Sequence, residues 1–167
     1  EQGASGRYLA VTPFIYLPLG QYDKNDAVNL GENRFKYDVQ LAWVQPLYGK
    51  WGFEFYQDAI WYGDNDKAGS GNQTLSQDTS YQTQVNLRYD LNAKQRFALG
   101  YAANYGGEQS LDGIQLNQNM EKQQARFEFQ HMMNAKTQLS AQLVSDTQVE
   151  SGLKKEFGLN FRLFYIF

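Results

Sequence analysis

The feature that most constrains this chain is a two-residue alternation of apolar and polar side chains, sustained over runs of about ten to thirteen residues. The run SYQTQVNLRYDL (80–91) shows it most clearly, because apolar residues or threonine occupy its odd positions and polar residues its even positions. Neighbouring side chains point to opposite faces of a β-strand. The run therefore predicts a strand with one apolar face and one polar face.

Eight segments carry this alternation, and nothing in the remaining sequence predicts a helix. The predicted strands cover 7–18, 34–45, 51–62, 80–91, 96–105, 123–133, 138–149 and 153–167. A chain of 167 residues fits one domain, and we take 1–167 as that domain. The predicted fold class is all-β, an antiparallel up-and-down barrel with eight strands in this chain.

The connections between these segments alternate in length. Three of them are short and turn-like, at 46–51, 90–96 and 133–138. Three others are long and polar, at 20–33, 63–79 and 106–122, whereas the connection around 149–152 is short. Strands that run between tight turns on one side and long loops on the other are typical of outer-membrane barrels.

Strand length and aromatic residues favour a barrel that crosses a membrane. The predicted lengths match the roughly 9–11 residues that a tilted transmembrane strand needs, whereas strands of soluble proteins most often have about five or six. Aromatic residues make up 16% of the chain and gather near strand ends, such as Trp43 and Trp51 on the turn side and Trp61 and Tyr81 on the loop side. Tyr and Trp favour membrane–water interfaces. We therefore expect a transmembrane barrel in the bacterial outer membrane, in contact with the lipid bilayer and lipopolysaccharide.

Composition excludes several other classes of protein and site. The net charge of −3 is spread along the chain and provides no basic footprint for nucleic acid. The sequence has no cysteine, which rules out disulfides and thiolate metal sites. We expect no cofactor.

The polar faces carry charges of both signs, which we predict to face the lumen. These candidates are Lys36, Asp38, Glu54, Asp58, Arg88, Asp90, Arg126, Glu128 and Arg162. An eight-stranded barrel has an interior that side chains just fill, whereas a wider barrel leaves an aqueous channel. In an eight-stranded barrel we expect these residues to form a hydrogen-bonded plug, and in a barrel of about twelve strands to line a pore.

The last strand and several short motifs resemble known sequences. Alternate residues of the C-terminal strand, Phe161, Leu163, Tyr165 and Phe167, resemble the assembly signal that the barrel-insertion machinery reads in outer-membrane barrels. The motifs YLPLGQYD (16–23), LGENRFKYD (30–38), LDG (111–113) and FRLFYIF (161–167) resemble the outer-membrane proteins of the phenol meta-degradation (MetA) pathway.

That resemblance implies a passage for aromatic or other small apolar compounds. Members of this family are typically longer, with further strands ahead of the matching region. The resemblance therefore implies that these residues are the C-terminal two-thirds of a barrel of about twelve strands. Closure with eight strands would instead require 7–18 to pair with 153–167. Segment 7–18 is apolar on both faces and contains Pro13, so the alternation leaves its inner face and its partner open.

Two other features are weaker candidates for sites. His131, the single histidine, falls on the apolar face, so we expect an interfacial and non-catalytic residue. The segment 63–72 begins like a calcium loop with Asp64 and Asp66, but Leu75 replaces the closing glutamate, which favours a solvated loop without metal.

From these features we expect an outer-membrane barrel for passive passage or binding of small molecules, aromatic ones among them. The alternative is a non-conducting structural or adhesive barrel that acts through its long loops. A barrel enzyme is the third interpretation, and we expect no enzymatic activity.

Overall fold

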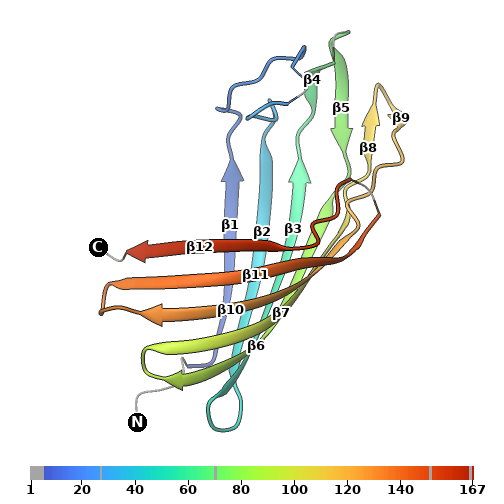
Figure 1. The fold of residues 1–167 in the computed structure, drawn as a ribbon. Coiled ribbons are helices and arrows are strands. Elements are labelled where there is room, and N and C mark those ends of the chain that lie inside the picture. Colours follow the sequence, from blue (N-terminus) through green and yellow to red (C-terminus); the bar gives the residue numbers. More distant parts are fainter. Residues whose placement is uncertain (1–5, 27, 70, 151, 166) are drawn as a thin grey trace.

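The computed structural model describes residues 6–26, 28–69, 71–150, 152–165 and 167, and every regular element in these residues is a β-strand (Figure 1). The strands are β1 (Tyr8–Tyr16), β2 (Lys36–Pro46), β3 (Trp51–Tyr62), β4 (Asn65–Ala68), β5 (Gln73–Gln77), β6 (Ser80–Asn92), β7 (Gln95–Gly106), β8 (Gln109–Leu111), β9 (Ile114–Gln115), β10 (Lys122–Met132), β11 (Thr137–Val149) and β12 (Gly158–Tyr165). In this described part of the chain, no helix has the length and apolar character needed to cross a membrane.

Eight of the strands form one large sheet in the order β1-β2-β3-β6-β7-β10-β11-β12. All neighbouring strands in this main sheet are antiparallel, and each follows its neighbour along the chain, apart from the short strands inserted at one end. The main sheet therefore has the up-and-down order that the alternating loop lengths predict.

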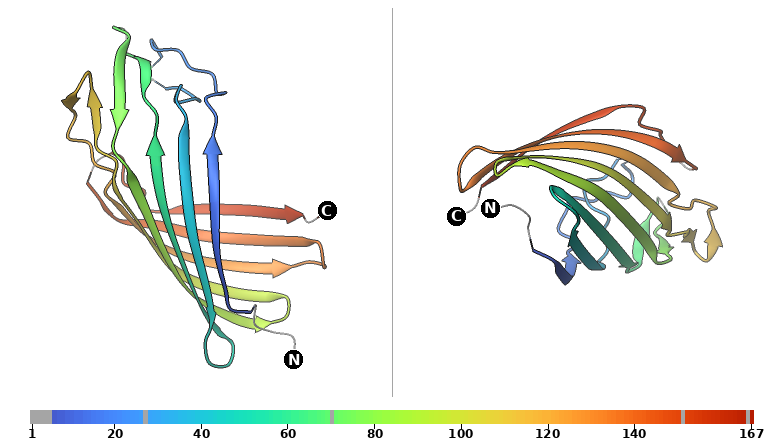
Figure 2. Two further views of the ribbon diagram at one scale, coloured as in Figure 1. Left: turned by 180° about the vertical axis from the view of Figure 1, so that it is seen from behind. Right: turned by 90° about the horizontal axis from the view of Figure 1, so that it is seen from below.

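The main sheet is open at its two edges. Among the described residues, β1 forms a ladder only with β2, and β12 only with β11. Twist accumulates from strand to strand, so that β12 crosses β1 at a steep angle in Figure 1, and the sheet curves into a trough in Figure 2. The eight strands described here do not close into a barrel by themselves.

The long connections contain a second sheet that the sequence analysis did not predict. The strands β4, β5, β8 and β9 pair antiparallel in that order beyond the loop end of the main sheet (Figure 1). Asp112 and Gly113, between β8 and β9, both have positive φ angles of 49° and 79°. This is the two-residue hairpin turn that an Asp-Gly pair favours. The prediction that 63–79 and 106–122 are only loops is therefore wrong.

The predicted strand 153–167 is too long at its N-terminal side, because β12 begins at Gly158. Gly152 has a φ of 95°, which ends the extended chain after β11. The backbone of Lys155 then bonds to Asp146, both to its backbone N–H at 2.8 Å and to its carboxylate at 2.7 Å. These two bonds hold 153–157 in a turn instead of a ladder.

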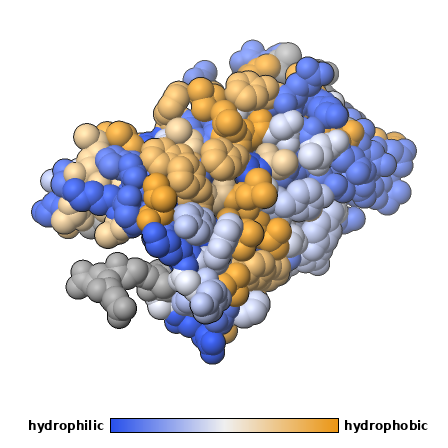
Figure 3. Space-filling view, turned by 60° about the horizontal axis from the view of Figure 1, so that its bottom comes forward, coloured by the Kyte–Doolittle hydropathy of each residue, from blue (hydrophilic) through white to orange (hydrophobic). Residues whose placement is uncertain are grey.

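The ladders place the apolar and polar side chains of the main sheet on opposite faces. Residues directly opposite each other share a face, so Leu87 of β6 lies between Phe53 and Leu99 on what we call the outer face. Large apolar residues of the outer face are exposed, whereas the inner face holds buried residues such as Arg88 and Asp146. Figure 3 shows hydrophobic residues gathered across the middle of one view of the molecule. A soluble barrel would bury its apolar face instead.

We expect Leu87→Arg to impair insertion of the protein into lipid vesicles. An arginine at the bilayer midplane on the lipid face of a barrel costs about 2–4 kcal/mol, and Leu87 lies near the middle of β6 on the exposed outer face. The inserted fraction can be read from the shift between folded and unfolded bands on gels. Leu87→Phe is the control, and equal insertion of the two variants would contradict a lipid-facing position.

Candidate functional site

The inner face of the main sheet brings together the charged residues that we predicted to face a lumen. Even-numbered residues of β2, β3, β6, β7, β10, β11 and β12 lie directly opposite one another in the ladders. This face includes all the candidates, namely Lys36, Asp38, Glu54, Asp58, Arg88, Asp90, Arg126, Glu128 and Arg162. They come from five strands, so only the sheet as a whole assembles them.

Arg88 is the centre of an ion-pair cluster at the turn end of the inner face. It is only 2% exposed, and its Nη1 donates to Glu54 Oε1 at 2.8 Å. Its Nε lies 3.4 Å from Asp90 Oδ2, and Asp90 Oδ1 lies 3.2 Å from Nε of Arg96. Buried charges need such partners to offset their lost hydration, and Arg88 therefore joins β3 to β6.

Small residues on the inner face make room for these long side chains. A Cβ atom added to Gly52 would lie 2.8 Å from Arg88 Nη2, and one added to Gly100 would overlap Asn86 Oδ1. Ala98 and Ala102 continue this row of small residues along β7. Large side chains from neighbouring strands therefore lie over β7.

Arg126 is held by amide side chains instead of carboxylates. Its Nε donates to Gln124 Oε1 and its Nη1 to Gln84 Oε1, both at 2.7 Å. Gln84 belongs to β6 and Gln124 to β10, so the guanidinium spans the intervening strand β7. The sequence analysis did not select these glutamines.

Glu128 and Arg162 are connected through a shared glutamine. Gln142 donates to Glu128 Oε2 at 3.1 Å and accepts from Arg162 Nη2 at 3.2 Å. Gln130 donates to the other oxygen of Glu128 at 2.9 Å. An amide has both donors and an acceptor, so Gln142 joins an anion on β10 to a cation on β12.

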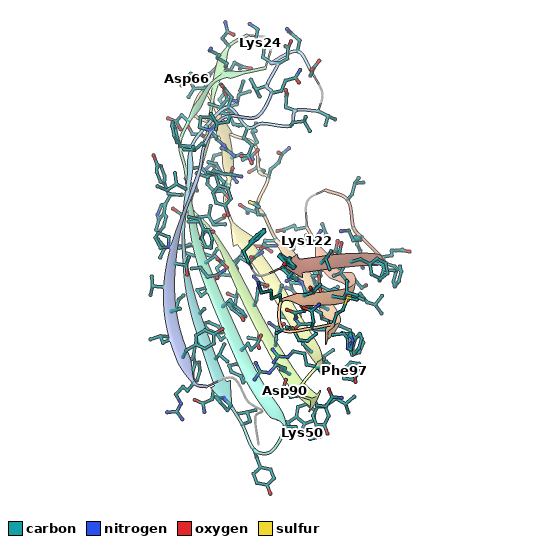
Figure 4. The ribbon with its side chains drawn as sticks, turned by 90° about the vertical axis from the view of Figure 1, so that its left-hand side faces the viewer. Lys24, Lys50, Asp66, Asp90, Phe97 and Lys122 are labelled. Carbon is teal, nitrogen blue, oxygen red and sulfur yellow. The ribbon has the colours of Figure 1, made fainter. Side chains whose placement is uncertain are left out.

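Asp146 is a second anchor of this face that the predicted set did not include. It is 2% exposed and accepts from Gln124 at 2.8 Å, from Lys122 Nζ at 2.8 Å and from the Lys155 backbone N–H at 2.7 Å. Figure 4 shows Lys122 between the loop end, marked by Lys24, and the turn end, marked by Lys50. Position in the alternation places Asp146 on this face, but only the structure supplies its partners.

Asp38 and Asp58 differ from Glu54, Asp90 and Asp146 because no basic residue among those described forms an ion pair with them. Asp58 accepts a hydrogen bond from Gln40 at 2.7 Å. Lys36, the nearest predicted base along β2, instead bonds to Glu32 at 2.6 Å and lies over the Tyr16 ring at 5.2 Å. The inner face of β2 and β3 is therefore acidic.

The ladder between β1 and β2 settles which side of segment 7–18 faces inward. Asp38 lies opposite Phe14, and Lys36 lies opposite Tyr16. The inner side of β1 therefore consists of Tyr8, Ala10, Thr12, Phe14 and Tyr16. This aromatic strip explains why alternation alone gave no polar side for this strand.

Arg34 fixes the long connection between β1 and β2 over the loop end of the sheet. Its Nε and Nη2 bond to Glu32 Oε2 at 3.0 and 2.9 Å, and its Nη2 also donates to Gln77 of β5 at 2.5 Å. Its guanidinium carbon lies 4.7 Å from the centre of the Tyr62 ring. We call residues 17–35 the cap loop, and Arg34 connects it to both sheets.

Close backbone approach also shapes the cap loop. A Cβ atom on Gly20 would lie 2.6 Å from Gly31 Cα. A larger residue at position 20 would therefore push these two segments of the cap loop apart. Lys24 donates to Asn72 at 2.6 Å, and Figure 4 shows Lys24 near Asp66 at the loop end. The cap loop is thus packed on the second sheet.

Glu32 has a perturbed pKa in this loop. Burial acts to raise the pKa of its carboxyl, but hydrogen bonds from Lys36 and Arg34 outweigh burial and hold the pKa below its usual value of 4.5. The carboxylate form therefore stabilises the folded cap loop.

Three residues of the predicted assembly signal, Phe161, Leu163 and Tyr165, lie on the outer face of β12, and Phe167 follows this strand. Phe161 is opposite Ala141, and Leu163 is opposite Leu139. Tyr165 and Phe167 contact each other edge-on with ring centres 5.3 Å apart. Their large exposed areas fit contact with lipid, while their role as a signal stays a prediction.

His131 and the segment 63–72, the two weaker candidates for sites, lie in surroundings that indicate a structural role. His131 lies on the outer face between Gln95 and Leu139, with its ring 6.5 Å from that of Phe129. In the segment that resembles a calcium loop, Asn65 Oδ1 accepts from Asn33 at 2.8 Å and from the Lys67 backbone at 3.0 Å. No group of three or more His, Asp or Glu placed to hold a metal ion occurs among the described residues.

The sequence matches a known protein family over nearly all of its length. Residues 3–163 match the family model described as "Putative MetA-pathway of phenol degradation". The chain belongs to this family. Membership confirms the resemblance that the short sequence motifs indicated.

A solved structure has the same fold as this chain. It is the crystal structure of an outer membrane channel from Pseudomonas putida F1, which is 40% identical and superposes with a TM-score of 0.92. The match covers 95% of this chain and 60% of that chain, so the present chain spans about 60% of the length of the channel. No curated protein sequence matches. The protein is thus an outer-membrane protein, as the strand pattern predicted.

We expect Arg88→Met to destabilise the protein by about 3 kcal/mol, because it leaves Glu54 without its counter-charge and Asp90 with only the more exposed Arg96. Arg96→Met is the matched control, since Arg96 pairs with the same Asp90 but its side chain is 38% exposed. An exposed pair contributes about 1 kcal/mol or less. Urea unfolding in detergent micelles measures both values, and equal destabilisation would contradict the central role of Arg88.

We expect the cap loop to lose protection from hydrogen exchange as the pH falls below 4.5, the usual pKa of Glu32. A carboxyl whose pKa is lowered by folding contributes its stability above the unfolded value, and this contribution disappears as the pH falls through the folded value. The expected effect is below about 1 kcal/mol, because Glu32 is partly exposed.

Hydrogen exchange followed by mass spectrometry, corrected for intrinsic rates, measures this change. Glu32→Gln should lower protection at neutral pH and remove the acid-dependent step, whereas Asp26→Asn in the same loop should leave both unchanged. An acid step of full size in Glu32→Gln would assign the effect to another group.

Proposed function

We propose that this chain forms part of the wall of an outer-membrane channel for small molecules. The observation that carries the proposal is the inner face, where charged and amide side chains from successive strands form one continuous polar surface. The opposite face is apolar and exposed. The likeness to an outer membrane channel at 40% identity supports the same role.

The channel requires closure of the main sheet, and we propose that strands beyond these eight complete the barrel. The edges β1 and β12 carry unpaired backbone groups, which are costly in lipid unless another strand covers them. The matched channel is longer than this chain, which supports a wider barrel. A barrel wider than eight strands leaves an open lumen, so the inner-face residues would line a pore.

The inner face also supports a proposal for the kind of solute. Tyr8, Phe14 and Tyr16 provide an aromatic strip on β1 beside Asp38 of β2. Aromatic side chains favour contact with other flat rings. Small aromatic or apolar compounds that diffuse passively down their gradient are therefore our proposed solutes.

We propose a channel that is not an enzyme. The only histidine of the sequence, His131, lies on the outer face beside Phe129, away from the polar inner face. A non-conducting structural or adhesive barrel is the alternative, and it is favoured by the second sheet at the loop end, where a partner could bind.

Lipid, lipopolysaccharide and the barrel-insertion machinery are the proposed partners of the assembled protein. The exposed outer-face residues Phe161 and Leu163 support contact with the bilayer and recognition during insertion. The cap loop and second sheet would face the lipopolysaccharide side, since long loops are extracellular in such barrels.

Conductance in planar lipid bilayers tests the channel directly. We expect the protein to conduct, with Arg126→Gln raising and Glu128→Gln lowering the cation-to-anion permeability ratio by about twofold, because each removes one lumen charge. Lys136→Gln, in the turn between β10 and β11, is the control and should leave the permeability ratio unchanged. Membranes that stay silent, with no uptake of apolar solutes by vesicles, would favour the structural alternative.

A further inference from the structure

The loop end of the main sheet contains a pocket at the end of the inner face, where Lys36 lies, away from the ion-pair cluster of Arg88. Its volume is about 520 Å³, within the range of roughly 300–1,000 Å³ that small-molecule sites occupy. It lies where the cap loop, the end of β3, strand β5 and the segment before β10 meet. We call it the mouth pocket, and Tyr22, Arg34, Lys36, Tyr62, Gln77 and Met120 are among the residues that line it.

Charges in the mouth pocket favour an anion. Its charged lining residues are Arg34, Lys36 and Glu32, so two cations face one carboxylate. The carboxylate is fully used, because Arg34 bonds to its Oε2 at 2.9 Å and Lys36 to its Oε1 at 2.6 Å. One positive charge remains without a counter-charge in the pocket wall.

Arg34 also retains an unused donor. Its side chain is 4% exposed, and its buried Nη1 has no hydrogen-bond partner among the described residues. A buried donor without an acceptor is costly. The face of the Tyr62 ring, 4.7 Å from the guanidinium carbon, compensates the charge but accepts no strong hydrogen bond. An anionic oxygen from a bound molecule would complete this site.

Part of the remaining pocket wall favours a flat, apolar ring, beside the amide side chains of Asn29, Asn65, Gln77 and Gln109. Tyr22 and Tyr62 contribute aromatic rings, and Leu75 and Met120 contribute aliphatic and thioether surface. The Met120 sulfur lies 3.8 Å from the Tyr62 hydroxyl and 3.3 Å from Gln77 Nε2. Sulfur and aromatic rings interact favourably, so a ring that enters here would find contacts along both sides.

We infer that the mouth pocket binds small aromatic anions, with the ring against Tyr62 and Met120 and the anionic group toward Arg34 and Lys36. The inference deepens the proposed function, since such a site at the loop end of the lumen would concentrate one class of solute before passage. Binding itself can be measured without passage, so the two claims fail separately.

Calorimetry of the detergent-solubilised protein with four probes tests this inference. Benzoate carries both features, cyclohexanecarboxylate only the charge, benzyl alcohol only the ring, and benzylamine the opposite charge. We expect benzoate to bind more tightly than cyclohexanecarboxylate, because only benzoate has a flat aromatic ring. We expect benzoate to bind about tenfold more tightly than benzyl alcohol, which is the usual effect of one charged hydrogen bond. Arg34→Gln should remove this advantage, and Arg34→Lys should restore part of it.

A charge placed on the opposite wall gives a readout that loss of structure would not produce. Met120 is 41% exposed, so Met120→Glu can be accommodated, and we expect it to reverse the preference from benzoate to benzylamine. Met133→Glu, the same change at an exposed methionine at the turn end, is the matched control and should bind like the unchanged protein.

Specific results would overturn the inference. They are equal binding of benzoate and cyclohexanecarboxylate, no binding of benzoate, or the same effect of Met120→Glu and Met133→Glu. Conductance without benzoate binding would reject the claim that the mouth pocket binds aromatic anions, but it would not contradict the channel. Benzoate binding by a protein that gives no conductance in membranes would reject the proposed passage, but it would support the aromatic-anion site in the mouth pocket.

Discussion

The whole structure depends on the hydrogen bonding of backbone groups in apolar surroundings. In a bilayer, each N–H and C=O must find a partner within the protein, and the antiparallel ladders from β1 to β12 provide these partners for every interior strand. The same ladders place alternate side chains on opposite faces. The apolar outer face and the charged inner face therefore follow from one constraint, and so does the need for a partner at each open edge.

Much of the main sheet could be predicted because its cause is local. The alternation in 80–91 depends only on neighbouring residues, and it gives the strand, the face of each side chain and the lipid-facing role of residues such as Leu87. The inner-face position of Arg88 and Glu128 follows from the same periodicity. Family membership and location in the outer membrane agree with this interpretation.

What the alternation could not supply depends on contacts between distant residues. Arg34 was the first residue of the predicted strand 34–45, but it lies two positions before β2 and joins Glu32, Gln77 and Tyr62 from three elements. Gln142 is an ordinary polar residue in the sequence, and only the register of β10 and β12 makes it a bridge between charges. The Asp-Gly turn after β8 was a local signal for the second sheet, and the polarity of its surroundings concealed it.

The central claim is that the polar face of the main sheet meets water in a lumen while the apolar face meets lipid. Because the sequence has no cysteine, single cysteines at successive positions 82–87 of β6 can be treated with a water-soluble thiol reagent in lipid vesicles. The account predicts that even positions react and odd positions are protected. Uniform reactivity, or reaction at the odd positions, would contradict it.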